Sequence, residues 1–456
     1  MTAQDAASPV TGREDGEPVT RRAPFSDNPR VGVRGQRTRQ RILDAALQVF
    51  GDEGFHRCSI ARISEKADCS RVSFYQYFSG KEDVFGSLAG QVARQISAST
   101  EAIDPLTPDA QGWDALRAWV GRYGDIHARY GPIFQALPAA FEKDSGLHVG
   151  AARLRDQTVA RIRSRLAAGD LPPRRLDPLL GLSIACLART LDDAASLRSV
   201  APTDYSRERV EAALTDVLHR SLFGRSDVNV RPSSFAHPRR VEFGPVIRDM
   251  LAKDEDIQAG TDRRAALRAL VENGRDVFVQ RGYHATRVDD LAAAAGVSHG
   301  VFYRYFENKD QLAIVLTIRA MRVAAGAFVE IPDLTTSSGT ELRRWLRRYN
   351  SAQSGEAAMI RVWVDAAQED TRLRSLSASA LDWGRRRMAR VLGGRGFGDI
   401  EMEALVMVAL LGAFGSLPRG ATAVDAAAHV VERGLLGRPG VSADRGSAGD
   451  RRGALR

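Results

Sequence analysis

The sequence predicts an all-α protein built from two similar units in tandem, on three observations. No stretch shows the sustained period-two alternation of a half-buried strand. Apolar residues recur at helical spacing instead, as at Ile42, Ala46 and Val49. The chain also repeats itself, because the stretch that begins at Arg57 aligns without a gap with the stretch that begins at Ala285. A chain of 456 residues is long for one hydrophobic core, which favours several domains.

The repeat covers a whole unit and not a single motif. The segment LRAWVGRY, residues 116–123, matches LRRWLRRY, residues 342–349. Further on, HRSLFG ends at Gly224 and ERGLLG ends at Gly437. Similarity that runs from a shared start to a shared end indicates duplication of a complete folding unit.

Proline and serine set the predicted boundary between the units. Their density between Arg225 and Gly260 breaks regular structure, so this stretch is a predicted linker. Both termini are polar, which predicts disorder. The predicted segments are a disordered tail (1–35), helix-turn-helix head 1 (36–85), helical domain 1 (86–224), the linker (225–260), helix-turn-helix head 2 (261–312), helical domain 2 (313–437) and a disordered tail (438–456).

Composition narrows the class of protein. The net charge of +9 is a mild argument for an acidic partner such as DNA. Three cysteines give no disulfide framework, and no signal peptide or membrane span stands out, so we expect a cytoplasmic protein with no membrane partner. No metal-ligand spacing, catalytic triad or paired acids are found, so we expect no metal, no cofactor and no enzyme activity.

Head 2 has the clearer helix-turn-helix pattern. Thr286 is a predicted N-cap for a helix over about 287–295. Gly296 supplies the turn, where a positive φ is favourable for glycine. Ser298 then caps a second helix over about 299–306. Helix, short glycine turn and helix together are the helix-turn-helix signature.

The second helix of head 2 has two distinct faces. Phe302 and Phe306 are four residues apart and face the core together. The outer face fits the major groove, with Arg304 as a donor to guanine, Val301 against a thymine methyl and the tyrosine hydroxyls on phosphates. Lys309 begins the next helix and is a predicted phosphate clamp. The candidate outer-face residues are His299, Gly300, Val301, Tyr303, Arg304 and Tyr305.

Head 1 follows the same plan with two departures. Ser59 or Cys58 starts its first helix, Ser70 caps the second, and Phe74 and Phe78 form the core pair. The candidate outer-face residues are Arg71, Val72, Ser73, Tyr75, Gln76 and Tyr77, with Lys81 as the clamp. Asp68 replaces the turn glycine, and Val72 replaces Gly300, so the heads offer different surfaces to bases.

The two cysteines of head 1 allow two interpretations. Cys58 and Cys69 flank the helix-turn-helix, as a redox switch could. They also stand where head 2 has Thr286 and Val297, as small buried residues would, and we favour this second interpretation.

The head motifs resemble the DNA-binding domain of the TetR/AcrR family of regulators. The resemblance rests on Gly-Tyr, Thr, a turn, Ser, the pattern FYxYF and a Lys-acid pair, over about fifty residues in each copy. It implies a two-headed transcriptional regulator, more often a repressor, that a small apolar ligand releases from DNA. Two alternatives stay open: an activator of the same fold, or a ligand-blind DNA-binding protein with one degenerate head.

The resemblance also implies that the helical domains bind ligand and pair through a four-helix bundle. The bundle candidates are residues 177–194, 207–222, 400–415 and 421–435. Packing of the helices near Leu187 and Leu411 would give a pseudo-dimer within one chain, on an operator of two unlike half-sites. A homodimer of two such chains stays open as an alternative. Aromatic residues that line a ligand pocket, or simply fill the core, are Trp119, Tyr123, Tyr130, Phe134, Trp345, Tyr349 and Trp363.

Overall fold

The computed structural model describes most of both units. The described residues are 32–143, 145–166, 172–198, 204–230, 265–369, 371–415, 417 and 420–439. The predicted tails, apart from residues 32–35 and 438–439, and the linker after residue 230 lie outside the described residues. Within the described part the chain forms helices and turns, and its β-structure is a single isolated bridge between Leu106 and Leu166.

The first unit is a small helical head followed by longer helices. Its elements are α1 (Val33–Glu53), α2 (Ile60–Lys66), α3 (Arg71–Tyr77), α4 (Lys81–Glu101), α5 (Ala110–Lys143), α6 (Ser145–Arg165), α7 (Pro173–Arg198) and α8 (Arg207–Phe223). Helix α1 begins within the predicted tail. Helix α4 runs without a break across the predicted boundary between head 1 and helical domain 1, so it links the two directly.

The second unit repeats this order. Its elements are α10 (Ala265–Ala285), α11 (Val288–Ala294), α12 (His299–Tyr305), α13 (Lys309–Val329), α14 (Gly339–Glu369), α15 (Thr371–Leu392), η3 (Gly393–Arg395), α16 (Ile400–Gly415), α17 (Ala421–His429) and η4 (Val430–Leu435). The predicted all-α class with two units in tandem is confirmed.

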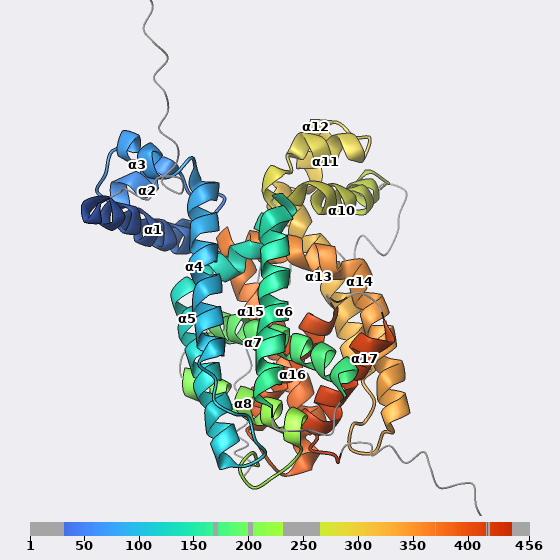
Figure 1. The fold of residues 1–456 in the computed structure, drawn as a ribbon. Coiled ribbons are helices and arrows are strands. Elements are labelled where there is room, and N and C mark those ends of the chain that lie inside the picture. The colour runs from blue at the N-terminus through green and yellow to red at the C-terminus, as the bar shows by residue number, and fades with distance from the viewer. Residues whose placement is uncertain are drawn as a thin grey trace, which may run out of the picture.

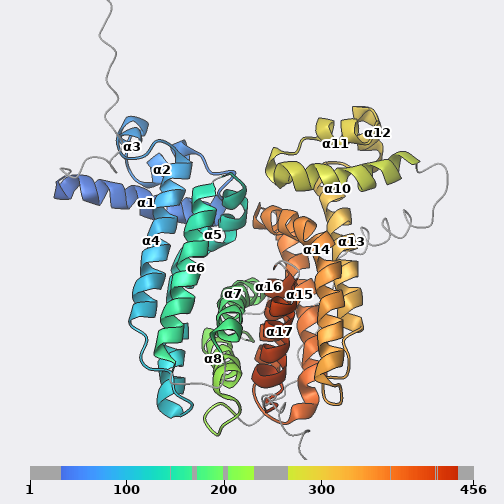
Figure 2. The same cartoon turned by 45° about the vertical axis from the view of Figure 1, so that its right-hand side comes forward.

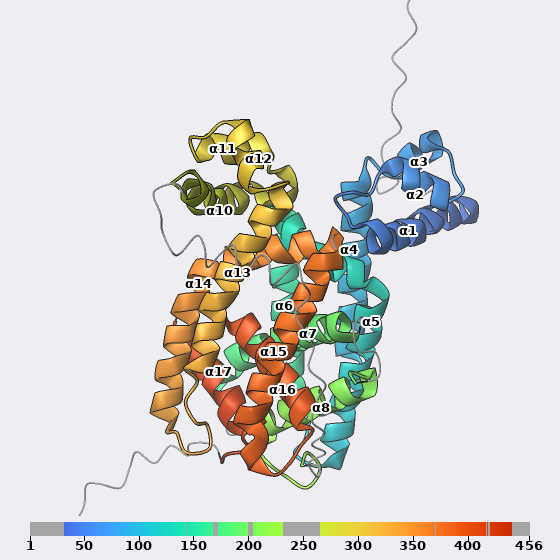
Figure 3. The same cartoon turned by 180° about the vertical axis from the view of Figure 1, so that it is seen from behind.

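The two heads lie at the same end of the molecule, above one shared helical body (Figure 1). Helices α4 and α13 lead from the heads down into that body (Figure 2). In its middle, α7 packs along α16, and α8 packs against η4 and α16. The view from behind shows α15, α16 and α17 of the second unit lying over α7 and α8 of the first (Figure 3). Helices α7, α8, α16 and α17, together with η4, match the segments predicted for the bundle.

The apolar core is divided unequally between the heads. One cluster of buried side chains runs from Phe74 in head 1 through Leu187 on α7 to Leu411 on α16. Head 2 has a separate cluster, in which Phe302 joins Trp363 on α14 and residues of α13 and α15. Among the described residues, the buried cluster of head 1 therefore extends through both units, whereas the buried cluster of head 2 consists of residues of the second unit.

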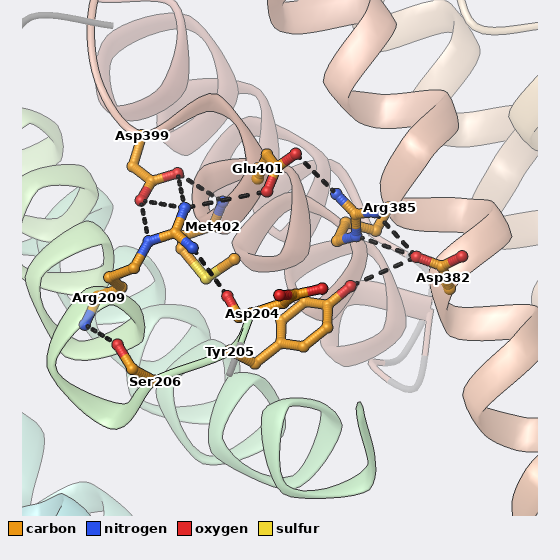
Figure 4. A network of polar contacts seen from close by, with 9 residues as sticks. All are labelled: Asp204, Tyr205, Ser206, Arg209, Asp382, Arg385, Asp399, Glu401 and Met402. Carbon is orange, nitrogen blue, oxygen red and sulfur yellow. Dashed lines mark hydrogen bonds and ion pairs between the residues drawn. The ribbon is translucent and has the colours of Figure 1, made fainter. Parts of the chain in front are cut away.

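Two ion pairs, one fully buried and one partly exposed, join the units. Arg220 on α8 lies 2.6 Å from the carboxylate of Glu403 on α16, and both side chains are fully buried. Arg209, also on α8, contacts both oxygens of Asp399 at 2.9 and 3.1 Å (Figure 4). In the same network the Tyr205 hydroxyl donates to Asp382 on α15. Such pairs add little net stability, but they penalise a wrong partner because an unpaired buried charge is costly.

One described helix passes the length and hydropathy test for a membrane span. Helix α13 reaches a mean hydropathy of 1.8, with 47% of the tested stretch buried inside the protein. Most of its buried residues belong to the core cluster of head 2, and Phe328 near its C-terminal end belongs to the cluster that spans both units. The core helix of a soluble protein passes the same test, so one such helix among the described residues is weak evidence for a membrane span.

Candidate nucleic-acid interface

Both heads make the same turn between their second and third helices. Asp68 has a φ of +48° in head 1, and Gly296 has a φ of +65° at the aligned place in head 2. The next amide closes each turn: Cys69 N donates to Ser64 O and Val297 N donates to Ala292 O, each at 3.0 Å. The predicted turn is confirmed in both heads, including the left-handed aspartate.

The helix starts differ between the heads. Ser59 Oγ accepts from Arg62 N at 3.3 Å, and Ser70 Oγ accepts from Ser73 N at 3.0 Å, so both predicted caps of head 1 are present. Ser298 is the N-cap residue of α12, but its side chain makes no capping bond. These serines are exposed at the helix starts.

The prediction that Thr286 caps a helix and contacts DNA is wrong. The N-cap residue of α11 is Arg287. Thr286 is 2% exposed, and its hydroxyl donates to Gly282 O at 2.7 Å. The side chain thus closes the end of α10 and does not face solvent.

The core face of each third helix is as predicted. Phe74 and Phe78 are buried with ring centroids 5.9 Å apart, and Phe302 and Phe306 are buried at 5.7 Å. This pairing fixes the rotation of α3 and α12, and thereby decides which side chains face outward.

The opposite face of each third helix is open to solvent. Val72 is 73% exposed, Tyr75 47% and Tyr303 49%. The other exposed residues of this face are Arg71 and Gln76 on α3 and His299, Gly300 and Arg304 on α12. Ser73, Tyr77, Val301 and Tyr305 are half-buried. The exposed apolar side chain is therefore Val72 in head 1, whereas Val301 is turned partly inward.

The predicted phosphate clamps have a different role. Lys81 Nζ donates to the carbonyls of Phe55, His56 and Cys58 at 3.0, 2.9 and 3.2 Å. Lys309 Nζ does the same to Tyr283, His284 and Thr286 at 2.7, 3.4 and 3.1 Å. A lysine ammonium has three donors, and here carbonyls take all of them. Each lysine holds the loop between the first two helices of its head and has no donor left for a phosphate.

An ion pair beside the second helix is inverted between the heads. In head 1, Arg62 contacts Glu53 at 2.9 Å. In head 2, the aligned positions hold Asp290 and Arg281, which lie 2.8 Å apart. The ion pair occupies the same aligned positions in both heads, but the charges of the two positions are exchanged. The second helix carries the arginine in head 1 and the aspartate in head 2, so the start of α11 is more acidic than that of α2.

A further acidic residue faces solvent in head 2. Asp289 is aligned with Ala61 of head 1, and its carboxylate lies 3.2 Å from His299 Nε2 with 78% of the side chain exposed. Asp289 is not among the residues predicted for the DNA face, although the ungapped alignment of the heads shows the Ala-to-Asp difference directly.

The cysteines behave as small packing residues. Cys58 is buried, Cys69 is half-buried, and both are free thiols. Burial raises the pKa of Cys58 to about 11, and burial also raises the pKa of Cys69. A raised pKa leaves little reactive thiolate at neutral pH, which agrees with the packing interpretation.

Each unit has a hollow against the helix that leads down from its head. A groove of about 510 Å³ between α4 and α6 is lined by polar residues such as Thr100, Gln157 and Arg161. A pocket of about 270 Å³ between α13 and α14 is lined by Trp345 and Tyr349, with Arg322 and Arg348 also on its wall.

The aromatic residues predicted to line a ligand pocket fall into two groups, those that line a hollow and those that are packed in the core. Trp345 and Tyr349 line the α13–α14 pocket, whereas the predicted residues of the first unit line neither hollow. Trp119, Tyr123 and Tyr130 are buried in the core and Phe134 packs against it. Trp363 is also core, where its indole donates to Ser377 Oγ. In the described residues, no group of three His, Cys, Asp or Glu side chains is placed to hold a metal ion.

Two helix-turn-helix heads with exposed recognition helices, on one helical body, define a DNA-binding regulator with a duplicated architecture. The family model for bacterial regulatory proteins of the tetR family matches residues 42–88 and again 270–316. The chain belongs to this TetR family.

Two relatives named as repressors agree with this assignment. The chain is 31% identical over 147 residues to the HTH-type transcriptional repressor NicS of Pseudomonas putida, a match that covers 31% of this chain and 68% of NicS. It is 51% identical over 41 residues to the HTH-type transcriptional repressor DhaR of a Mycobacterium species, covering 9% of this chain and 21% of DhaR. A solved TetR-family regulator from Streptomyces coelicolor aligns with 41% of this chain and 80% of its own, at 23% identity and a TM-score of 0.33.

Proposed function

We propose that this chain is a transcriptional repressor that binds an operator of two unlike half-sites with both of its heads. The observation that carries the proposal is that one chain presents two exposed recognition helices with different side chains. Arg71, Val72 and Gln76 face outward on α3, whereas His299, Gly300 and Arg304 do so on α12. Arg304 is suited to guanine and Val72 to a thymine methyl, while Tyr75 and Tyr303 are suited to phosphates. NicS and DhaR, to which the chain is similar, are named as repressors.

The contacts between the units support a single chain as the binding unit. Arg220 of the first unit is paired with Glu403 of the second. The aligned residue in the second unit is Arg433, whose buried Nε has no hydrogen-bond partner among the described residues. A second copy of the first unit would not offer Arg220 the same carboxylate. The contact surface between the units thus favours packing of the first unit on the second unit of the same chain. It disfavours packing of two first units, or of two second units, from different chains.

We further propose that a small apolar ligand releases the repressor by entering the α13–α14 pocket. Trp345 and Tyr349 give this pocket an aromatic wall, and a volume of about 270 Å³ suits a compact molecule. Helix α13 begins directly after head 2, so a ligand wedged against it would tilt α12. The cytoplasm, where the DNA is, is the proposed location.

The DNA-binding proposal is tested by selecting bound duplexes from a random-sequence library and footprinting the enriched site. We expect two unlike protected half-sites about one helical turn apart, covered by a monomer in light scattering. Paired alanine substitutions at Tyr75 and Gln76, or at Tyr303 and Arg304, should each remove protection of one half-site. A palindromic site would contradict the proposal, and one silent head would favour the alternative with a degenerate head.

Two further experiments address regulation. Transcription in vitro from a promoter that contains the selected site separates repressor from activator. For the ligand, a Gly326→Leu variant fills the pocket, because a side chain at Gly326 meets no atom within 4 Å. A screened apolar compound should stabilise the native protein and release DNA, and should do neither with the variant. Compounds that act equally on both proteins would place the effector site elsewhere.

A further inference from the structure

We propose that His56 and His284 form a head-to-head contact that sets the distance between the two recognition helices. Their imidazole rings stack with centroids 4.0 Å apart and an interplanar angle of 20°. One ring belongs to head 1 and the other to head 2, so the contact joins the two heads directly. This inference rests on the proposed function, since it concerns how two heads meet one operator.

The contact lies where the heads approach each other. Helices α1 and α10 point their C-terminal ends towards the middle of the molecule (Figure 2). His56 follows the end of α1 at Glu53, and His284 lies at the end of α10. The ungapped alignment of the heads pairs these two histidines with each other. Equivalent residues can touch in this way only near an axis that relates the heads, so neither head can turn inward without displacing the pair.

Each histidine is fixed to its own head by a lysine. The carbonyl of His56 accepts from Lys81 Nζ at 2.9 Å, and its ring stands edge-on to Phe55 at 5.4 Å. The carbonyl of His284 accepts from Lys309 Nζ at 3.4 Å, and its ring stands edge-on to Tyr283 at 5.1 Å.

These attachments lead directly to the recognition helices. Lys81 is the first residue of α4 and Lys309 the first of α13, and each comes shortly after α3 or α12. A displacement of either histidine is therefore transmitted almost fully to the recognition helix of the same head. His56 and His284 act as positioning residues, because they lie off the outer faces of α3 and α12 and work through the head that carries them.

The first test measures the distance between the heads without DNA. Spin labels are placed at exposed positions by Gln48→Cys and Asp276→Cys, in a full-length background with Cys58→Thr, Cys69→Val and Cys186→Ala. The first two replacements copy the aligned residues of head 2. We expect one narrow distance in this parent, and a distribution about twofold wider when both histidines become Ala. Replacement of both by Phe keeps a stacked pair and should keep the narrow distance.

The second test measures the preferred half-site spacing. Duplexes carrying the selected site, with spacing changed by up to three base pairs in either direction, are titrated with each variant. The wild type and the His56→Phe, His284→Phe variant should lose about tenfold or more in affinity away from the best spacing. The double alanine variant should vary by less than about threefold, and a His56→Lys, His284→Lys variant should favour a longer spacing because two cations repel.

The outcomes separate this inference from the proposed function. An unchanged distance distribution and an unchanged spacing preference in the double alanine variant would overturn the inference while DNA binding stands. Failure of the wild type to enrich any sequence would overturn the proposed function, and the spin-label distances would still decide whether the histidines hold the heads. Thermal melting of each variant shows whether the fold is intact, and a purely structural role would alter melting without altering spacing.

Discussion

The two heads have the same internal skeleton and different outer surfaces. The positive-φ turn, the buried phenylalanine pair and the lysine that binds three carbonyls occur in both. The outer face of the third helix differs at four of six aligned positions and keeps its two tyrosines, and the ion pair beside the second helix has exchanged its signs. Backbone and core requirements therefore fix one set of positions in both heads, whereas the exposed positions are free to differ and to set which DNA sequence each head binds.

The largest expected effect is the loss of the shared lysine. Lys81→Met or Lys309→Met leaves three carbonyls without their donor, which should destabilise the affected head by about 2–4 kcal/mol. Hydrogen exchange of the two heads in the full chain measures this effect head by head. Because the ammonium is already used inside the protein, the salt dependence of DNA binding should not change. A salt slope reduced by about one, with unchanged exchange, would restore the phosphate-clamp role.

The next effect concerns sequence preference. Arg304→Ala should cost about 1–3 kcal/mol of binding and relax the preference at one base position of the second half-site. The aligned residue in head 1 is Gln76, and Gln76→Arg should shift the matching position of the first half-site towards guanine. Competition titrations with single-base variants of the selected duplex measure both changes. Equal losses on specific and random DNA would count against base contact by Arg304.

Exchange of the turn residues tests how far the skeletons are equivalent. Gly296→Asp should destabilise head 2 by about 1 kcal/mol, since the left-handed conformation is costly for a residue with a Cβ. Asp68→Gly should change the stability of head 1 by less, because glycine relieves the turn but also loosens the unfolded chain. Urea unfolding followed by hydrogen exchange provides both values. Changes in unfolding free energy that are equal and opposite for the two substitutions would show that effects on the unfolded chain contribute nothing to either value.

The smallest expected effect comes from the acidic surface of head 2. Asp289→Asn removes a negative charge beside the proposed DNA face and should tighten binding about twofold at low salt. The matched substitution in head 1, Ala61→Asp, should weaken binding by a similar factor. Both effects should fade as salt is raised, because the charges are exposed. Effects that persist in high salt would indicate a structural change in the helix start and not electrostatics.

The local features of the heads could be predicted from sequence because they depend on nearby residues. The caps at Ser59 and Ser70, the turn at Asp68 and the Phe pairs each follow from a few consecutive positions. Helices α8 and α16 lie at nearly their predicted bounds, whereas α7 extends four residues beyond its predicted segment at each end. Long stretches of apolar periodicity can be recognised without tertiary information.

The roles of other side chains could not be assigned from the sequence because they depend on partners distant in the chain. Lys81 begins a helix and has the pattern of a phosphate clamp, but the carbonyls that it binds come from a loop before α2. Thr286 has the pattern of a cap, yet the end of α10 folds over it. The aromatics of the first unit could be pocket or core by composition, and only packing shows that Trp119 and Tyr130 are buried.

The sequence by itself determined that this protein is all-α, duplicated and two-headed. Helical periodicity and turn residues are local signals, and an internal repeat is seen by comparing the sequence with itself. Only the tertiary structure decided which side chains remain exposed and which units pair. It also placed His56 against His284, although the two lie in different units. These features arise from packing between segments far apart in the chain, where one residue's role depends on what folds against it.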